Sequence, residues 1–262
     1  MTLPQAAGSD DAGMERRTPR VAVVTGAGTG IGRATAHALA TAGYAVVAVG
    51  RRAAPLSETA AGRPDITPLT ADVTAPDGPG RIVSAALDRY GRLDVLVNNA
   101  GVAGGGPLAD LDEDAARRQL ETNLLAPVRL AHAAVEALAA TRGVLVNVTT
   151  SVGLRAWPGS SVYAAGKAAL DSLTRSWAVE LAPRGIRVVA VAPGAIDTPI
   201  GVHSGLSPER RAAVRDWQLA HTPAGRIGRP EDVAWAIRRL CEPEAGFVTG
   251  VVLPVDGGAV VA

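Results

Sequence analysis

The chain has very few residues of the types that build disulfides and metal sites. Among its 262 residues there is one cysteine, Cys241, so no disulfide can form within the chain, and a reducing compartment is the simplest setting. The four histidines lie far apart in sequence and lack the usual ligand spacings with cysteine or carboxylates; they are His37, His132, His203 and His221. We therefore expect no metal site.

Two further absences narrow the class of protein. The formal net charge is only +1 and the arginines are scattered, so a nucleic-acid surface is not expected. No uninterrupted apolar stretch reaches the roughly 18 residues that a membrane span needs. Residues 1–19 have no apolar run, which predicts a flexible N-terminal tail rather than a signal peptide. We expect a soluble cytoplasmic protein with one domain over residues 20–262.

Lysine is the scarcest of the chemically active residues. Of the 26 basic residues, Lys167 is the only lysine and all the others are arginines. This exception indicates a role that needs a compact ammonium rather than a planar guanidinium. Tyr163 lies four residues earlier, and apolar residues recur at helical spacing over residues 160–181. The two side chains therefore share one helix face, with Cβ atoms roughly 5–6 Å apart.

This spacing suits proton transfer. A free tyrosine titrates near pH 10, and a proton donor working near neutrality needs a pKa about 3 units lower, or roughly 4 kcal/mol. One ammonium about 4 Å away at an effective dielectric of ~20 supplies on the order of 4 kcal/mol. We therefore expect Lys167 to lower the pKa of Tyr163. The alternative is an ordinary surface pair that stabilises a helix.

A glycine-rich turn follows the first expected strand, residues 21–25. The segment from Gly26 to Gly32 reads GAGTGIG, and an alanine-rich helical stretch covers residues 33–42. Backbone N–H groups at such a helix N-terminus can hold a pyrophosphate. The turn has a TGxxxGxG arrangement, because the third glycine of the usual G-x-G-x-x-G pattern would fall at Ile31. The alternative is a flexible turn without a ligand.

The end of the second expected strand, residues 45–50, indicates which dinucleotide binds. An acidic residue there would take the ribose hydroxyls of NAD, whereas arginine accommodates the 2′-phosphate of NADP. Gly50 occupies the acidic position and is followed by Arg51 and Arg52. This favours NADP(H) over NAD(H), with a solvated basic turn as the alternative.

Strands and helices alternate along the rest of the chain. We expect strands at residues 66–71, 94–98, 144–148, 186–192 and 251–255, and helices at 76–90, 113–140, 160–181 and 230–240. Such alternation predicts an α/β fold, a doubly wound parallel sheet of about seven strands with helices on both faces. Ligands of these sheets bind at the carboxyl ends of the strands. Residues 197–225 are less regular and follow a strand end, which predicts a substrate lid.

These motifs together resemble those of the short-chain dehydrogenase/reductase family in its common form. The resemblance covers about residues 19–261, with the motifs in the family's order: Thr25 to Gly32, Asn98 to Gly101, Asn123, Tyr163 to Lys167, and Pro193 with Gly194. It implies a Rossmann-type fold and hydride transfer between a nicotinamide and a carbonyl or secondary alcohol.

The resemblance also implies roles for single residues. Tyr163 would give a proton to the carbonyl oxygen in reduction and take one in oxidation. Lys167 would lower the Tyr163 pKa and hold the nicotinamide ribose, and Asn123 would position a water. Inside its expected helix, Asn123 could also bond back to the preceding turn. The expected cofactor-binding residues are Gly26, Thr29, Gly30, Ile31, Arg51, Arg52, Asp72, Val73, Asn99, Tyr163, Lys167, Pro193, Gly194, Ile196 and Thr198.

One position departs from the family pattern. The family places a serine hydroxyl beside the tyrosine, as the fourth residue of an N-[IV]-[ST]-S pattern at a strand end. Counted from Asn147, that residue is Thr150, and the serine follows at Ser151. Successive residues of extended chain point to opposite sides, so both cannot serve equally. Either Thr150 supplies the hydroxyl or a bulge brings Ser151 round, and we favour Thr150.

We therefore predict an NADPH-dependent enzyme that reduces a ketone or 3-oxoacyl-type carbonyl to a secondary alcohol. The alternatives are an NAD(P)-dependent secondary-alcohol dehydrogenase and a nicotinamide-binding sensor without turnover. Arg142 and Arg184 are candidates for contact with an acidic carrier protein. The resemblance implies a homodimer or homotetramer. Candidate substrate-pocket residues, with lid packing as their alternative role, are Gly104, Trp157, His203 and Trp217.

Overall fold

A computed structural model describes residues 18–151, 159–200 and 208–262, and these residues form a seven-stranded parallel sheet. The sheet order is β3-β2-β1-β4-β5-β6-β7. The strands are β1 (Val21–Thr25), β2 (Ala45–Gly50), β3 (Ile66–Thr70), β4 (Val95–Asn98), β5 (Val144–Val148), β6 (Arg187–Pro193) and β7 (Val252–Val255). The predicted doubly wound α/β fold is thereby confirmed. The expected tail falls almost wholly outside the described residues and stays a prediction.

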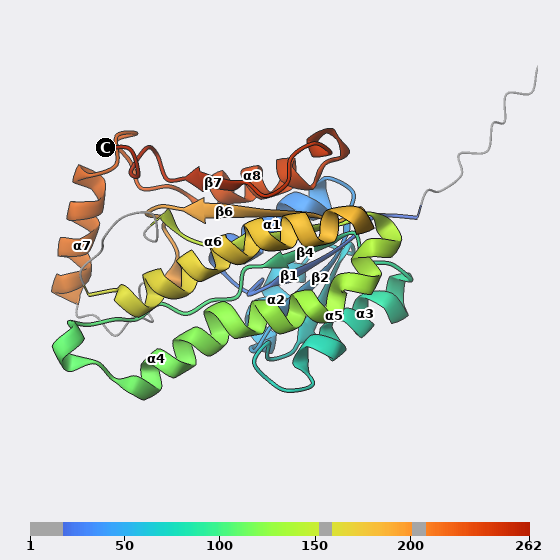
Figure 1. Ribbon diagram of the computed structural model, residues 1–262, viewed down its shortest axis with the longest axis horizontal. Coiled ribbons are helices and arrows are strands. Elements are labelled where there is room, and N and C mark those ends of the chain that lie inside the picture. The colour runs from blue at the N-terminus through green and yellow to red at the C-terminus, as the bar shows by residue number, and fades with distance from the viewer. Residues whose placement is uncertain (1–17, 152–158, 201–207) are drawn as a thin grey trace, which may run out of the picture.

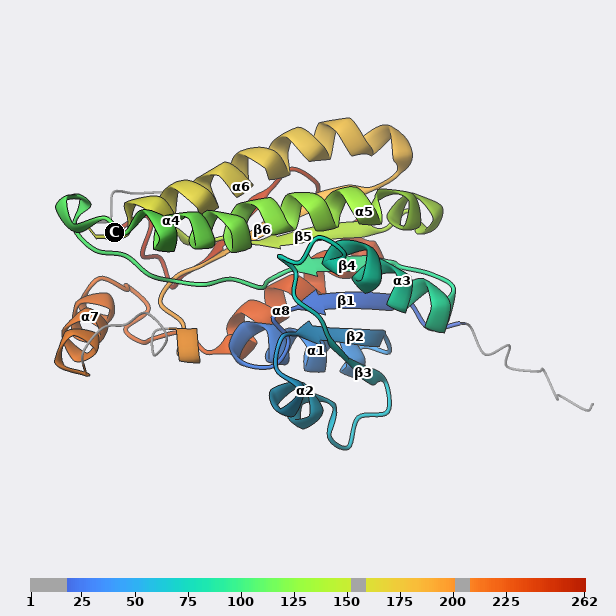
Figure 2. The same ribbon diagram turned by 90° about the horizontal axis from the view of Figure 1, so that it is seen from below.

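Helices cover both faces of the sheet, as the alternation of elements predicts (Figure 2). One face carries α1 (Gly30–Thr41), α2 (Ala53–Ala60) and α8 (Pro230–Cys241). The other carries α3 (Gly78–Tyr90), α5 (Ala126–Thr141) and α6 (Ser161–Leu181). The strand arrowheads in Figure 1 point toward α7 (Pro208–Ala220), so α7 lies at the carboxyl edge of the sheet.

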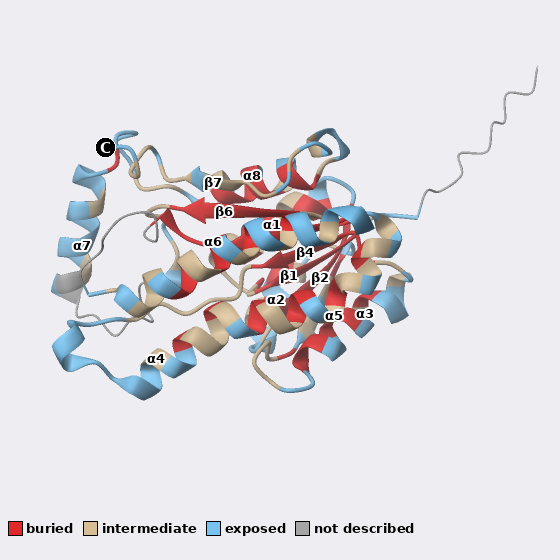
Figure 3. Ribbon diagram, viewed as in Figure 1, coloured by how far each residue is buried: buried red, intermediate tan, exposed pale blue. Residues whose placement is uncertain are grey.

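The strands are apolar on both sides because each faces a helical layer. Ala22 and Val24 of β1 pack into the core under α1 and α8. Val21 and Val23 of the same strand pack into the core under α3 and α5. Figure 3 shows the central strands as the most buried elements of the molecule. The polar residues that end these strands are therefore held on a rigid support at the carboxyl edge.

The helix expected over residues 113–140 is interrupted. It consists of α4 (Glu113–Leu120), a π-helical turn η2 (Glu121–Leu125) and α5. By length and composition alone, the stretch Glu113–Thr141 is apolar enough to cross a membrane. In the fold, however, α5 buries Leu130 and Leu138 in the core against the sheet. It is therefore a core helix of the domain.

Most element boundaries lie within a few residues of those expected. Helix α1 begins at Gly30, three residues earlier than predicted, because the glycine turn itself forms the first helical turn. Helix α2 was not expected from the sequence, since it has only eight residues, contains Pro55 and buries only Leu56 and Thr59. Short helices of this kind owe their stability to packing rather than to propensity.

Candidate active site

The turns after β1 and β4 meet at the point where the sheet order reverses. Thr25 Oγ1 donates a hydrogen bond to Val97 O at 3.1 Å and accepts one from the backbone N of Asn99 at 3.0 Å. The Asn99 side-chain amide donates to Thr25 O at 2.7 Å. Asn99 thus holds the glycine turn in place, and in parallel sheets this switch point is where ligands bind.

The glycine turn has the shape of a dinucleotide cradle. An ideal Cβ on Gly32 would lie 2.3 Å from Gly26 O, so a side chain cannot fit there. Gly26 and Gly30 have φ angles of 65° and 53°, in the left-handed region that favours glycine. Thr29 is the extended N-cap residue of α1, so the first N–H groups of the helix face the carboxyl edge of the sheet. These residues fit a pyrophosphate.

Thr198 closes the other side of this cradle. It follows β6 by five residues, and an ideal Cβ on Gly30 would lie 3.2 Å from Thr198 Cγ2. Ile196 is held nearby by a parallel bridge to Gly228. Pro193 is the last residue of β6, and Gly194 follows it. Gly194 N donates to Val255 O at 3.0 Å. The structure therefore brings the expected residues after β1 and β6 together.

The expected adenosine side lies at the ends of β2 and β3. Arg51 and Arg52 are exposed directly after β2. Asp72 Oδ1 accepts hydrogen bonds from Thr74 N at 2.9 Å and Thr74 Oγ1 at 2.8 Å. Burial opposes ionisation of Asp72, but the bonds from Thr74 and the charge of Arg51 outweigh it and hold its pKa below the ordinary value. Val73 follows in the same loop.

Tyr163 and Lys167 lie one turn apart on α6, against the end of β5. Lys167 is buried, and its Nζ donates to Val148 O at 2.7 Å. Tyr163 is half-buried, and the Thr150 side chain forms a hydrogen bond with it. Burial raises the pKa of Tyr163, and the bond with Thr150 acts in the opposite direction. Burial also lowers the pKa of Lys167 to about 8, against the charge of Asp171.

That Lys167 lowers the pKa of Tyr163 stays a prediction, and two other effects act on this pKa in the structure. In the structure burial dominates at Tyr163, and the group that favours its ionisation is the Thr150 hydroxyl. Lys167 is itself buried and directs its amine at the Val148 carbonyl.

Asn123 sits in the π-helical turn and is buried. Its side chain bonds Val102 in both directions, with Oδ1 accepting from Val102 N at 2.9 Å and Nδ2 donating to Val102 O at 2.8 Å. It therefore ties η2 to the loop after β4 and does not bond back to its own helix. An ideal Cβ on Gly101 would lie 3.2 Å from Asn123 Oδ1 and 3.8 Å from Lys167 Nζ. Asn123 and Lys167 thus converge on Gly101.

The structure distinguishes Thr150 from its neighbour Ser151. Both are buried at the end of β5. The Thr150 hydroxyl lies 3.4 Å from Pro193 O and bonds Tyr163, so it links β5, β6 and α6. This contact supports Thr150 as the residue that takes the place of the family's serine.

The candidate pocket residues are only partly described. Trp157 and His203 lie outside the described residues. Gly104 lines a hollow of about 450 Å³ that also borders Arg51 and the start of α6. Trp217 on α7 stacks on His221, with ring centroids 4.0 Å apart, and is 41% exposed. It is not part of that hollow.

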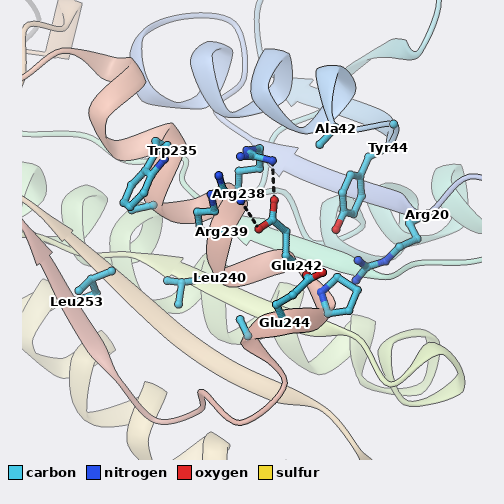
Figure 4. A pocket seen from close by; sticks show the side chains of 14 residues that line it. Arg20, Ala42, Tyr44, Trp235, Arg238, Arg239, Leu240, Glu242, Glu244 and Leu253 are labelled. Atoms are coloured by element: carbon cyan, nitrogen blue, oxygen red, sulfur yellow. Dashed lines mark hydrogen bonds and ion pairs between the residues drawn. The ribbon is translucent and has the colours of Figure 1, made fainter.

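A larger groove lies at the opposite end of the sheet. It has a volume of about 1030 Å³ and is bordered by Arg20, Tyr44 and Trp235, which Figure 4 shows between α1, α8 and the segment that follows α8. Arg142 and Arg184 precede β5 and β6 and therefore also lie at this amino edge, where Arg184 pairs with Glu136 at 2.6 Å. Their contact with an acidic carrier protein stays a prediction.

Comparison with known proteins identifies the family of this chain. Residues 26–260 match a family model described as "Enoyl-(Acyl carrier protein) reductase". A cis-4-hydroxycyclohexanecarboxylate dehydrogenase of Sinomonas cyclohexanicum is 44% identical, over 91% of this chain and 96% of its own. A 3-oxoacyl-[acyl-carrier-protein] reductase of Thermotoga maritima is 38% identical, over 92% of this chain and 98% of its own.

The solved structures extend the likeness to the backbone. The 3-ketoacyl-(acyl-carrier-protein) reductase of Brucella melitensis, complexed with NADH, superimposes with a TM-score of 0.85 and 32% identity, over 92% of this chain and 98% of its own. A short-chain dehydrogenase/reductase of Caenorhabditis elegans, solved with cofactor, superimposes with a TM-score of 0.86 and 33% identity. The match covers 93% of this chain and 96% of the other. The chain therefore belongs to the short-chain dehydrogenase/reductase family and is an oxidoreductase that acts on CH–OH and C=O groups with a nicotinamide cofactor.

Proposed function

We propose that this protein is an NADP(H)-dependent reductase that converts a ketone or 3-oxoacyl-type carbonyl to a secondary alcohol, with Tyr163 as the proton donor. The observation that carries the proposal is the cluster of Tyr163, Thr150, Lys167 and Asn123 beside the glycine cradle at the carboxyl edge. A phenol, a hydroxyl and an amine there surround the space that a substrate oxygen would occupy next to the cradle.

Each side chain then has one task in the reaction. A nicotinamide cofactor held by the glycine cradle and Thr198 would supply the hydride for reduction of a carbonyl, or accept it in oxidation of an alcohol. Tyr163 gives its hydroxyl proton to the substrate oxygen, so one hydride and one proton complete the alcohol. The Thr150 hydroxyl donates to the same oxygen and orients it. Lys167 stabilises the phenolate that Tyr163 leaves behind. Asn123, whose side chain is bonded to Val102, fixes the loop after β4 beside the site, where a water from solvent would return the proton to Tyr163.

The choice of NADP(H) rests on the end of β2. Gly50 stands at the position of the NAD-selective carboxylate, and the exposed Arg51 and Arg52 follow it. A charge-assisted hydrogen bond to a phosphate contributes about 1.5–3 kcal/mol, so Arg51→Asp should weaken NADPH binding by roughly ten- to a hundredfold and NADH binding far less. Titration of cofactor fluorescence measures both. Arg89→Asp, an exposed arginine at the far end of α3, is the matched control.

Turnover is tested with NADPH and NADH against a panel of ketones that includes 4-oxocyclohexanecarboxylate and 3-oxoacyl thioesters. Tyr163→Phe should lower kcat by about 10²- to 10⁴-fold while the cofactor still binds. Equal rates for Tyr163→Phe and wild type would overturn the role of Tyr163. Cofactor binding without hydride transfer to any member of the panel would favour the sensor that the sequence left as an alternative.

A second candidate is a secondary-alcohol dehydrogenase that works in the oxidative direction. The name of the Sinomonas relative, a cis-4-hydroxycyclohexanecarboxylate dehydrogenase, supports it. Oxidation of that hydroxy acid, together with a tenfold or greater preference for NAD over NADP, would replace the reductase with this function.

Three structural expectations accompany the proposal. The position of α7 at the carboxyl edge of the sheet supports a lid over residues 197–225, of which residues 201–207 lie outside the described residues (Figure 1). Self-association into a dimer or tetramer is supported by large apolar side chains that are exposed in the single chain, among them Leu125, Val179, Trp235 and Phe247. Light scattering measures the oligomeric state.

A reducing, cytoplasmic location agrees with the one buried thiol, Cys241.

A further inference from the structure

A buried carboxylate lies one helical turn beyond Lys167. Asp171 is 2% exposed, and its Oδ1 atom is buried without a hydrogen-bond partner among the described residues. Carboxylates are seldom fully buried, because an ionised group taken out of water needs a compensating charge or hydrogen bonds. The reaction proposed above gives Asp171 no task, so its burial needs another explanation.

Asp171 and Lys167 are held by neighbouring residues of the same strand. Lys167 Nζ donates to Val148 O at 2.7 Å, and a hydrogen bond from the Thr149 side chain, whose Oγ1 also lies 3.4 Å from Val191 O, acts to lower the pKa of Asp171. Thr149 is fixed in turn, since its backbone N donates to Val191 O of β6 at 2.8 Å. Residues four apart on a helix lie on one face, so the amine and the carboxylate face the end of β5 side by side.

Among the described residues, Asp171 is the carboxylate that faces Lys167. Helix α6 contributes Tyr163 on one side and Asp171 on the other, with the exposed Arg175 one turn further on. The end of β5 contributes the uncharged Val148, and Thr149 follows it; η2 contributes the Asn123 amide near Gly101. Burial lowers the pKa of Lys167 to about 8, and the charge of Asp171 acts against this fall. Burial also raises the pKa of Asp171, against the Thr149 hydrogen bond and the charges of Arg175 and Lys167.

At neutral pH the pKa of Lys167 is therefore only about one unit above the pH. An amine with a pKa near 8 loses its charge on about a tenth of molecules at pH 7, and a further fall of one unit would remove the charge from about half. A group that moves this pKa decides whether the amine next to Tyr163 is an ammonium.

We propose that Asp171 is a positioning residue that acts through Lys167: its carboxylate, anchored by Thr149, keeps the buried amine charged and directed at the end of β5. This inference rests on the proposed function of Tyr163 and Lys167 and adds a residue to it. A purely structural role, in which Asp171 only ties α6 to β5 through Thr149, predicts a change in stability but none in the ionisation of Lys167.

The composition of the chain provides a direct measurement. Lys167 is the only lysine, so protein labelled at the lysine ε carbon gives one lysine side-chain NMR signal, and its shift against pH reports the ionisation of Lys167 alone. In Asp171→Asn, which keeps the size of the side chain, we expect the midpoint to fall by about one pH unit, a roughly tenfold rise in the acid dissociation constant. The alkaline loss of kcat/KM should move down with it.

Two further variants and one control complete the test. Glu180→Gln removes an exposed carboxylate from the same helix, and screening by water should leave the midpoint unchanged. Asp171→Glu should restore part of the shift, because it returns the charge. Thr149→Val leaves Asp171 in place but removes its hydrogen bond, so the carboxylate ionises less readily and the midpoint falls in the same direction.

An unchanged midpoint in folded Asp171→Asn overturns the proposal. If that variant does not fold, an unchanged midpoint in Thr149→Val overturns it instead. The titration needs no substrate, whereas the proposed function is decided by turnover of the wild type, so either can fail without the other.

Discussion

The prediction that separates Thr150 from Ser151 follows from one hydrogen bond at the end of β5. Thr150→Val removes the hydroxyl that contacts Tyr163 and keeps the shape of the side chain. Both residues are buried, at 5% and 6% exposure, so exposure does not distinguish them and only the contact with Tyr163 does. The variant should therefore lose catalysis while the fold is kept.

We expect Thr150→Val to change three quantities: kcat, the free energy of unfolding and the pKa of Tyr163. Loss of one oriented donor to a substrate oxygen lowers kcat by about 10²- to 10³-fold, or roughly 3–4 kcal/mol of transition-state stabilisation. The lost bond near Pro193 O is long, at 3.4 Å, so the free energy of unfolding should fall by only about 1 kcal/mol. Because Thr150 favours ionisation of Tyr163, its removal also raises the pKa of Tyr163 further. The rise of the oxidative rate with pH should then move to more alkaline pH.

The assay compares kcat, KM and the pH profile of three variants. Thr150→Ser keeps the hydroxyl and should retain activity within about threefold, and Ser151→Ala should do the same. The reasoning is refuted if Thr150→Val is as active as wild type while Ser151→Ala loses two orders of magnitude. Cofactor binding, measured by fluorescence, should be unchanged in all three and controls for folding.

The remaining predictions concern two glycines and the buried thiol. Gly32→Ala places a Cβ 2.3 Å from Gly26 O, so we expect the variant to lose about 1–3 kcal/mol of stability and to bind cofactor more weakly. The control is Gly80→Ala in α3, where the added Cβ meets no atom within 4 Å outside its own helix; this change should stabilise the fold by up to about 1 kcal/mol. Thermal unfolding and cofactor titration measure both, and a Gly32→Ala protein that binds cofactor normally would contradict the cradle. Burial raises the pKa of the Cys241 thiol to about 12, so a thiol reagent at pH 8 should react only in denaturant, and rapid labelling of native protein would contradict its burial.

Local sequence patterns predicted most of the elements. Strand runs and helical periodicity located the seven strands and most of the helices because these signals depend only on neighbouring residues. Helix α2 escaped prediction because its apolar face is limited to Leu56 and it carries Pro55. The π-helical turn at Asn123 escaped because it spans only five residues, too few for an apolar pattern to reveal a change of helical period.

The site shows the same division. The scarcity of lysine identified Lys167, and the four-residue spacing predicted that it shares a face with Tyr163. The expectation that Lys167 lowers the pKa of Tyr163 did not take burial into account. No local pattern reports burial, and burial has the largest effect on the pKa of both residues. Asp171 was missed for the same reason, since its spacing from Lys167 was visible but its desolvation was not.

The sequence by itself determined the fold class, the family and the residue types that end each strand, because these follow from periodicity, turn chemistry and motif order along the chain. Only the tertiary structure decided which of those residues meet. The bonds of Asn123 to Val102, of Thr150 to Tyr163 and of Lys167 to Val148 join residues from separate elements. Their geometry depends on how α6 and η2 pack against the sheet, and the low dielectric created by that packing then sets the charge that each group carries.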